Sequence, residues 1–265
     1  MFDIRIINGT VYDGTGSEPK KKDIGITGDI IRSIDDLSRA EARITIDASN
    51  HMVCPGFIDV HSHSDTYLLI EPSAHSKIFQ GITAEVIGNC GASAAPLEGS
   101  YQLPSDWAEK KYPGKWRSVS DYRNLLGQVK PAVNVFMLIG HKALRVAAAG
   151  YENRKVTADE ISAMRAILEK ALDEGGRGLS SGLIYAPASS ATREELTELA
   201  KTVKQRNGIY TSHMRSEGAN LLSAIEETIS IGRETGIRVE ISHLKTAGRK
   251  NWNLIDKALD TIREA

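Results

Sequence analysis

Two histidines one residue apart, His61 and His63, follow an apolar run in the segment "FIDVHSH". Imidazole nitrogens and cysteine sulfurs are ligands that zinc prefers in proteins. Three more side chains of these kinds stand at the ends of other apolar segments: Cys90, His213 and His243. A single histidine in such a place is more often an ordinary hydrogen-bonding residue. Four of the seven histidines at segment ends, together with a cysteine, favour a metal site, with zinc as the metal.

Apolar segments alternate with helix-like segments over most of the chain. The candidate strands are 57–63, 84–90, 134–141, 176–183, 208–214 and 238–244. One helix is expected to begin at the capping box Thr157–Glu160 and to end at the two glycines 175–176. Alternating strands and helices, with nearly continuous apolar strands, predict a parallel sheet with helices outside it. Reactive groups gather at the C-terminal ends of such strands, so the five candidate ligands are expected to meet there.

Other residues near these segments have less certain roles. His141 ends the third candidate strand and is a further candidate for contact with the site. Asp59 and Asp65 flank the histidine pair, and Asp59 is expected to lie deep below the site. The connection within 101–130 is long, which favours a flap or lid. Cys54 precedes a proline and is expected to be packed.

The first 55 residues have a different pattern from the rest. Short β-branched runs are broken by turn signals, which is typical of a small sheet domain. Asn8–Gly9 between two such runs predicts a β-hairpin, and Gly28–Asp29 predicts a second turn.

Composition excludes several classes of function. The formal net charge of −1 gives no basic surface for nucleic acid or an anionic membrane. No apolar run approaches the roughly 18 residues that a membrane span needs. The N-terminal segment "MFDIRIINGT" has charges within its apolar stretch, unlike a secretory signal. With only two cysteines, no disulfide framework is expected, and we expect a cytoplasmic protein.

Several short motifs resemble the amidohydrolase superfamily and, within it, the N-acyl-D-amino-acid deacylases (D-aminoacylases). In chain order they are "CPGFIDVHSHSD", "GITAEVIGNCG", "GHKALR", "GLSSGLIYAP", "YTSHMRSEG" and "ISHLK". The resemblance covers residues from about 3 to 250. It implies a TIM-like (β/α) barrel preceded by part of a small β-sandwich.

The resemblance also implies how the ligands are divided. Cys90, His213 and His243 would hold a tightly bound zinc, while His61 and His63 would border a second metal position that is weaker or empty. Hydantoinases and dihydroorotases, the nearest competitors, bridge two metals with a lysine from the fourth strand. The fourth candidate strand here, "GRGLSSGL", contains no lysine.

Two further residues are assigned by the same resemblance. Lys245 and Tyr185 would hold the α-carboxylate of the substrate, because an ammonium and a phenol hydroxyl can both donate to a carboxylate. Arg215 and Glu217 are expected to form a pair behind His213. The proton shuttle of the family is an aspartate after the eighth strand, so we expect it beyond residue 265, and no catalytic residue is assigned within the chain.

The chain is therefore expected to be the N-terminal portion of a longer enzyme. A (β/α)8 barrel takes about 250 residues, whereas six candidate strand units follow the sheet region here. We expect residues 1–55 to be the β-sandwich portion and 56–265 an incomplete α/β barrel of about six of eight units. Open edges and exposed interior surface would make the isolated chain self-associate, with weak or no activity.

The predicted function is zinc-dependent hydrolysis of the amide bond of small-molecule N-acyl-D-amino acids. The products are a D-amino acid and a carboxylic acid. One alternative is a cyclic-amide hydrolase similar to hydantoinases or dihydroorotases. Another is a non-catalytic metal-binding remnant.

Overall fold

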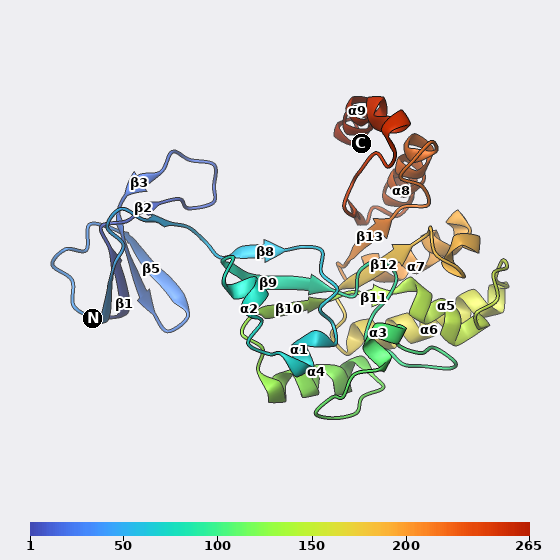
Figure 1. Cartoon of the computed structure of the whole chain (residues 1–265), viewed down its shortest axis with the longest axis horizontal. Helices are drawn as coiled ribbons and strands as arrows, with labels where there is room; N and C mark the ends of the chain where they lie inside the picture. Colours follow the sequence, from blue (N-terminus) through green and yellow to red (C-terminus); the bar gives the residue numbers. More distant parts are fainter. The chain divides into compact units, whose positions relative to one another are not determined.

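The computed structural model describes residues 1–265. The chain forms two compact units, Met1–Phe57 and Ile58–Ala265. Figure 1 shows the strands and helices of each unit.

The N-terminal unit contains two small sheets. The four-stranded sheet has the order β5 (Ile30–Asp35), β4 (Asp23–Thr27), β1 (Phe2–Ile7) and β6 (Ala42–Asp47). The three-stranded sheet has the order β3 (Lys20–Lys21), β2 (Thr10–Val11) and β7 (Met52–Val53). The turn at Gly28 joins β4 to β5 as an antiparallel pair, as the sequence predicts, and Gly28 has a φ of +63°.

The hairpin predicted at Asn8–Gly9 is wrong. Asn8 does have a positive φ of 64°, but β1 and β2 belong to different sheets. The backbone N–H of Asn8 donates to the carboxylate of Asp23 at 3.0 Å, and its side-chain amide donates to Asp47 at 3.0 Å. These long-range bonds hold the turn, so the chain crosses from one sheet to the other instead of folding back.

The second unit is a mixed α/β structure, as predicted. Its strands are β8 (Phe57–Asp59), β9 (Ile82–Ile87), β10 (Asn134–Met137), β11 (Ile139–Gly140), β12 (Gly178–Gly182), β13 (Ile209–His213) and β14 (Arg238–Ile241). They form two sheets with the orders β10-β9-β8 and β11-β12-β13-β14. The pairs β9–β10, β11–β12, β12–β13 and β13–β14 are parallel. Only Leu138 lies between β10 and β11 in the sequence. Within each of the two sheets, neighbouring strands are also neighbours in chain order.

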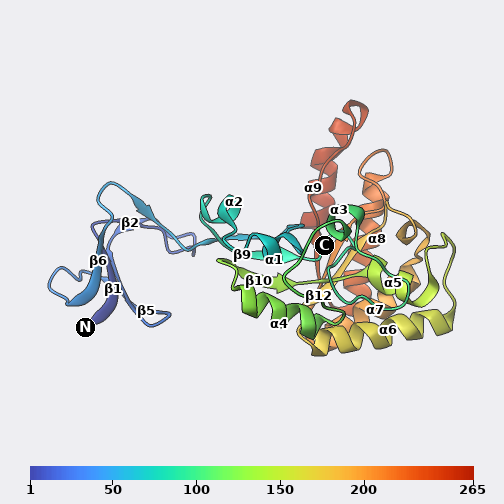
Figure 2. The same cartoon turned by 60° about the horizontal axis from the view of Figure 1, so that its bottom comes forward.

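Helices connect these strands. They are α1 (Tyr67–Ile70), α2 (His75–Ile78), α3 (Ser105–Ala108), α4 (Val119–Val129), α5 (His141–Ala149), α6 (Ala158–Asp173), α7 (Arg193–Gln205), α8 (Leu221–Thr235) and α9 (Ile255–Arg263). Two 3₁₀ turns are η1 (Ala188–Ser190) and η2 (Arg249–Leu254). The capping box predicted for α6 is present, with Thr157 Oγ1 accepting from the N–H of Glu160 at 3.2 Å. Helices α5 to α9 lie side by side in chain order (Figures 1 and 2).

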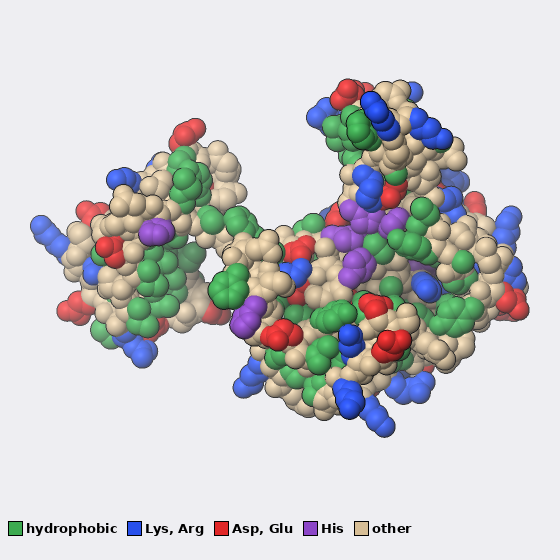
Figure 3. Space-filling view, in the orientation of Figure 1, with side chains coloured by type: hydrophobic (Ala, Val, Ile, Leu, Met, Phe, Trp, Pro, Cys, Tyr) green, Lys and Arg blue, Asp and Glu red, His purple; other side chains and the backbone are tan.

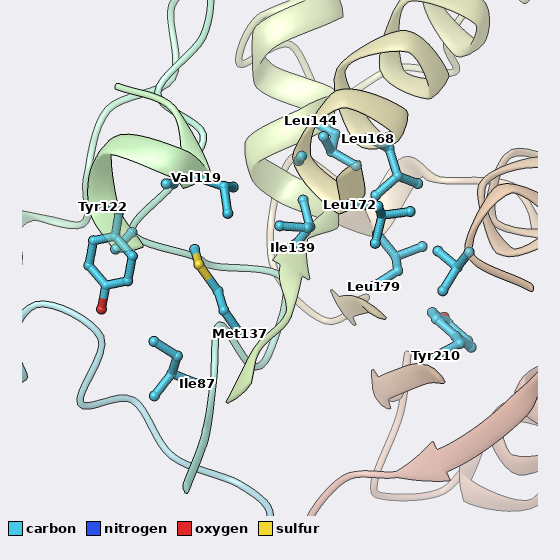
Figure 4. Close-up of a cluster of buried hydrophobic side chains, with 14 of the residues drawn as sticks. Ile87, Val119, Tyr122, Met137, Ile139, Leu144, Leu168, Leu172, Leu179 and Tyr210 are labelled. Atoms are coloured by element: carbon cyan, nitrogen blue, oxygen red, sulfur yellow. The ribbon is translucent and has the colours of Figure 1, made fainter. Parts of the chain in front are cut away.

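The core of this unit lies between the strands and helices α4 to α7. Leu144 on α5 and Leu168 on α6 meet Ile139 and Leu179 from strands β11 and β12 (Figure 4). These side chains are fully buried. Full burial of an aliphatic side chain of this size contributes about 1.5–3 kcal/mol, so this cluster fixes the strands whose ends form the candidate site.

The connection within 101–130 is not a loose flap. Its aromatic side chains Trp107, Trp116 and Tyr122 are buried in the core. The indole Nε1 of Trp116 also donates to the carbonyl of Ala94 at 2.8 Å. Burial of three large aromatic rings holds this segment against the rest of the unit, so the prediction of a flap is wrong.

Two smaller findings concern the surface. Cys54 is exposed and free, not packed as expected. None of the helices has both the length and the apolar character needed to cross a membrane.

Candidate metal centre

The histidine pair lies just beyond the first strand of the α/β unit. β8 ends at Asp59, and His61 and His63 follow it. The backbone N–H of His61 donates to the Asp59 carboxylate at 3.1 Å, and the two imidazole rings lie 5.2 Å apart. Asp59 also accepts from Lys77 Nζ at 2.5 Å, so its carboxylate is occupied by structural contacts below the pair.

Cys90 lies in a tight loop after β9. Gly88, Cys90 and Gly91 all have positive φ angles, of 78°, 53° and 78°. A Cβ at Gly88 would lie 2.1 Å from the carbonyl oxygen of Leu138, and one at Gly91 would lie 2.9 Å from the nitrogen of Gly182. Only glycine fits such positions without strain, so the glycines of "GNCG" allow the Cys90 loop to pack closely against the neighbouring strand ends.

Five side chains come together above the strand ends. The potential ligand atoms of His61, His63 and Cys90 lie within 4.8 Å of one another, and so do those of Cys90, His213 and His243. The Cys90 sulfur, which both groups share, lies 3.4 Å from His61 Nε2 and 3.5 Å from His243 Nε2. A group of histidine side chains gathers on this face of the unit (Figure 3).

Burial shifts the pKa values of this cluster. Desolvation, with the neighbouring His243, lowers the pKa of His61 to about 4. Desolvation also lowers the pKa of His63 and of His213. The imidazoles of His61, His63 and His213 are therefore neutral near pH 7, with lone pairs available. Burial raises the pKa of the Cys90 thiol to about 11, so binding of a metal as thiolate would release its proton.

Three buried ring nitrogens of the cluster have no hydrogen-bond partner. They are Nδ1 of His61 and both Nδ1 and Nε2 of His213. Leaving a buried polar atom without a partner costs about 1–3 kcal/mol. A metal ion bound to these nitrogens would remove that cost. Neutral imidazoles and one thiolate at these separations fit a transition-metal ion such as zinc.

The model of the family described as "Amidohydrolase family" matches residues 45–260. The chain belongs to the amidohydrolase family. It is 40% identical to the D-aminoacylase of Alcaligenes xylosoxydans xylosoxydans, over 100% of this chain and 55% of that protein. It is 39% identical to the N-acyl-D-aspartate deacylase of the same organism, over 99% of this chain and 53% of that protein. The amidohydrolase chain thus spans about half the length of these curated relatives.

Solved structures give the same result. A D-aminoacylase structure matches with a TM-score of 0.93 at 40% identity, over 100% of this chain and 56% of that one. The N-acyl-D-glutamate deacylase of Bordetella bronchiseptica, complexed with zinc and a phosphonate inhibitor, matches with a TM-score of 0.93 at 37% identity, over 99% and 56%. A D-hydantoinase matches at 16% identity with a TM-score of 0.60, which shows the fold alone. The predicted resemblance to amidohydrolases and D-aminoacylases is confirmed.

The two residues predicted to contact substrate in this amidohydrolase lie next to the cluster. The ring of Tyr185 lies 5.0 Å from that of His213, and its side chain is half exposed. Lys245 Nζ lies 2.9 Å from His243 Nδ1. Both side chains are therefore close to the candidate ligands at the C-terminal ends of β13 and β14.

The predicted pair of Arg215 and Glu217 does not form. Arg215 donates from Nε and Nη2 to the carboxylate of Glu227 on α8, at 3.0 and 2.9 Å. Glu217 instead contacts Lys245, and its Oε1 lies 3.0 Å from His243 Nδ1. Helix α8 turns back over the loop after β13 and brings Glu227 to Arg215. Because Arg215 is paired with Glu227, Glu217 is available to contact the cluster.

His141 lies outside the cluster. It is the first residue of α5 and is fully buried, and its Nε2 lies 2.8 Å from the carboxylate of Glu195. Arg145 Nη1 donates to both oxygens of the same carboxylate at 2.6 Å. His141 is therefore part of a buried ion-pair network, and its candidacy for contact with the site is not supported.

Asp65 and Ser180 support the Cys90 loop, although neither was assigned a role from the sequence. The buried Asp65 carboxylate accepts from the N–H of Gly88 at 3.2 Å and from the N–H of Ala94 at 3.3 Å. Ser180 Oγ accepts from the N–H of Gly91 at 3.0 Å and donates to the carbonyl of Gly88. Burial raises the pKa of Asp65 to about 7. The place of Asp65, two residues after His63, was the available signal.

Proposed function

We propose that this amidohydrolase hydrolyses N-acyl-D-amino acids to a D-amino acid and a carboxylic acid. The observation that carries the proposal is the convergence of Cys90, His213 and His243 from three different strand ends. Relatives named D-aminoacylase, N-acyl-D-aspartate deacylase and N-acyl-D-glutamate deacylase, at 36–40% identity, support the substrate class.

The metal in this proposal is zinc. Cys90, His213 and His243 would hold it tightly, and His61 and His63 would border a second, weaker position. The unpartnered nitrogens of His213 and the shared Cys90 sulfur support this division. A bound zinc ion acts as a Lewis acid toward a carbonyl and lowers the pKa of a bound water to about 7.

The substrate carboxylate would be held by Lys245 and Tyr185. The side chain of Lys245 is about half exposed and its ammonium lies beside His243, so the ammonium can exchange protein contacts for a ligand's carboxylate. The exposed side chain of Tyr185, next to His213, can add a hydroxyl donor. A charge-assisted hydrogen bond of this kind orients the amide toward the ligand cluster.

We propose that the six strand positions of residues 56–265 are part of a TIM-like barrel and that residues 1–55 are part of a β-sandwich. Exposed apolar side chains at the first strand, Ile58 and Val60, support self-association of the chain in isolation. The two free cysteines support a cytoplasmic location.

A cyclic-amide hydrolase is the weaker alternative. A dihydroorotase of Thermoanaerobacter is 28% identical over 98% of this chain. β12, however, has the sequence "GLSSG" and supplies no lysine to bridge two metals. Cys90 in the candidate site favours the deacylase.

The test compares three substrates with the zinc-loaded product of the complete gene. We expect hydrolysis of N-acetyl-D-methionine, much slower hydrolysis of N-acetyl-L-methionine and no opening of a hydantoin ring. Opening of hydantoin without hydrolysis of N-acetyl-D-methionine would instead establish the alternative.

A further inference from the structure

The carboxylate of Glu217 lies close to three side chains of the candidate site, those of His213, His243 and Lys245. Its Oε1 lies 3.0 Å from His243 Nδ1 and 3.8 Å from His213 Nε2, and it contacts Lys245 Nζ. The Glu217 side chain is only 12% exposed. One nearly buried carboxylate therefore faces two proposed zinc ligands and the proposed substrate lysine.

The backbone of Glu217 fixes where this carboxylate lies. Its carbonyl accepts from the N–H of Ala247 at 2.7 Å. That bond ties the loop after β13 to the loop after β14, which contains His243 and Lys245. The side-chain and main-chain contacts of Glu217 thus join the same two loops.

His243 needs a particular tautomer to bind a metal at this place. Its Nε2 is the nitrogen near the Cys90 sulfur, at 3.5 Å, so Nε2 must have the lone pair and Nδ1 the hydrogen. Lys245 Nζ lies 2.9 Å from Nδ1, and an ammonium can only donate. Lys245 alone would favour a lone pair on Nδ1 and a hydrogen on Nε2. An ionised carboxylate can only accept, so Glu217 favours the opposite tautomer.

We infer that Glu217 is a positioning residue that selects the Nδ1–H tautomer of His243 against the opposite preference of the Lys245 ammonium. The inference rests on the proposed function, because it gives Glu217 its role at the zinc ligand His243. Carboxylates that accept from the second nitrogen of a ligating histidine fix its orientation and make it a better ligand. The negative charge of the Glu217 carboxylate also compensates the positive charge of Lys245, and their contact holds the lysine side chain near the site.

The experiment measures the His243 tautomer and zinc affinity together. Ring nitrogen NMR of ¹⁵N-histidine-labelled chain reports the tautomer, and competition with a chromogenic chelator reports the zinc dissociation constant. In Glu217→Ala we expect His243 to shift toward the Nε2–H form and zinc affinity to fall roughly 10- to 100-fold. Glu217→Gln keeps an acceptor oxygen without the charge, so its loss should be smaller.

Glu226→Gln is the matched control, because Glu226 is an exposed residue on α8 that pairs only with Arg233. It should change neither readout. A merely structural role for Glu217 would alter the urea midpoint of the metal-free chain and leave the tautomer of His243 unchanged. The nearly isosteric Glu217→Gln keeps the inference testable if the alanine variant unfolds.

Two results separate the inference from the proposed function. If the Glu217 variants keep the Nδ1–H form and wild-type zinc affinity while His243→Ala loses zinc, the metal site stands and the inference is wrong. If His243→Ala also binds zinc like the wild type, the proposed site is itself wrong.

Discussion

Replacing Glu195 by alanine should destabilise the α/β unit strongly. The Glu195 carboxylate accepts two hydrogen bonds of 2.6 Å from Arg145 Nη1 and lies 2.8 Å from His141 Nε2. The side chains of Arg145 and Glu195 are 1% and 0% exposed. The alanine variant would leave the guanidinium charge buried without its carboxylate, and arginine cannot lose its proton.

The size of the effect follows from the burial of the pair. Removing one partner of a buried ion pair typically costs about 3–5 kcal/mol. We therefore expect the free energy of unfolding of Glu195→Ala to fall by this amount. A second replacement, Arg145→Met, should recover part of the loss, because it removes the unpaired charge.

Glu198→Ala provides a matched control on the same helix. Glu198 pairs with Lys201 at 2.7 Å, and both side chains are more than 40% exposed. Both substitutions replace a glutamate of α7 by alanine, so most of the difference between them reports the buried network of Glu195. An exposed pair of this kind contributes about 0–1 kcal/mol.

Urea unfolding of the metal-free chain, followed by circular dichroism, measures these changes without the added stability of bound zinc. Burial opposes ionisation of Glu195, but the hydrogen bond from His141 and the charge of Arg145 outweigh it and lower its pKa. A lowered folded pKa means that the stabilisation is complete above the unfolded pKa of about 4.3 and is lost as pH falls through the folded pKa. The difference between wild type and Glu195→Gln should therefore shrink in acid. Equal destabilisation by Glu195→Ala and Glu198→Ala would refute this reasoning.

Two further substitutions test the support of the site. Asp65→Asn replaces an acceptor of two N–H groups by a side chain with a single acceptor oxygen, so either Gly88 or Ala94 loses its partner. We expect a loss of about 1–3 kcal/mol and faster hydrogen exchange of one of these amides, and unchanged exchange at both would contradict it. Trp116→Ala should cost about 3–5 kcal/mol in urea unfolding, because the ring is 7% exposed, whereas Trp252→Ala, at a position 61% exposed, should cost little. Equal losses of unfolding free energy in Trp116→Ala and Trp252→Ala would support the flap hypothesis instead.

The clustering of Cys90, His213 and His243 could be anticipated from the sequence for a topological reason. Successive parallel strands place their C-terminal ends at one edge, so residues far apart in sequence meet there. Strand order follows chain order through β14, which is the simplest arrangement for alternating strands and helices. Pattern and connectivity together were sufficient to place these side chains, whereas their role as ligands is still a proposal.

Side-chain partners in the loops could not be predicted in the same way. Arg215 pairs with Glu227, which is on the helix that returns over its loop, and not with Glu217 nearby in sequence. His141 ends a predicted strand, but the chain enters α5 at that residue and directs its ring toward Glu195. These outcomes depend on the angle at which each helix leaves its strand, and hydrophobic periodicity does not encode that angle.

Binding of zinc by Cys90 is the central prediction for this site. The measurement is zinc content and affinity of the wild-type chain, Cys90→Ala and Cys54→Ala after identical loading and removal of weakly bound metal. Cys54 is also free but is exposed in the other unit, so its variant controls for the loss of a thiol. We predict that the wild type and Cys54→Ala retain tightly bound zinc and that Cys90→Ala loses it. Retention of zinc by Cys90→Ala with wild-type affinity would contradict the proposed centre.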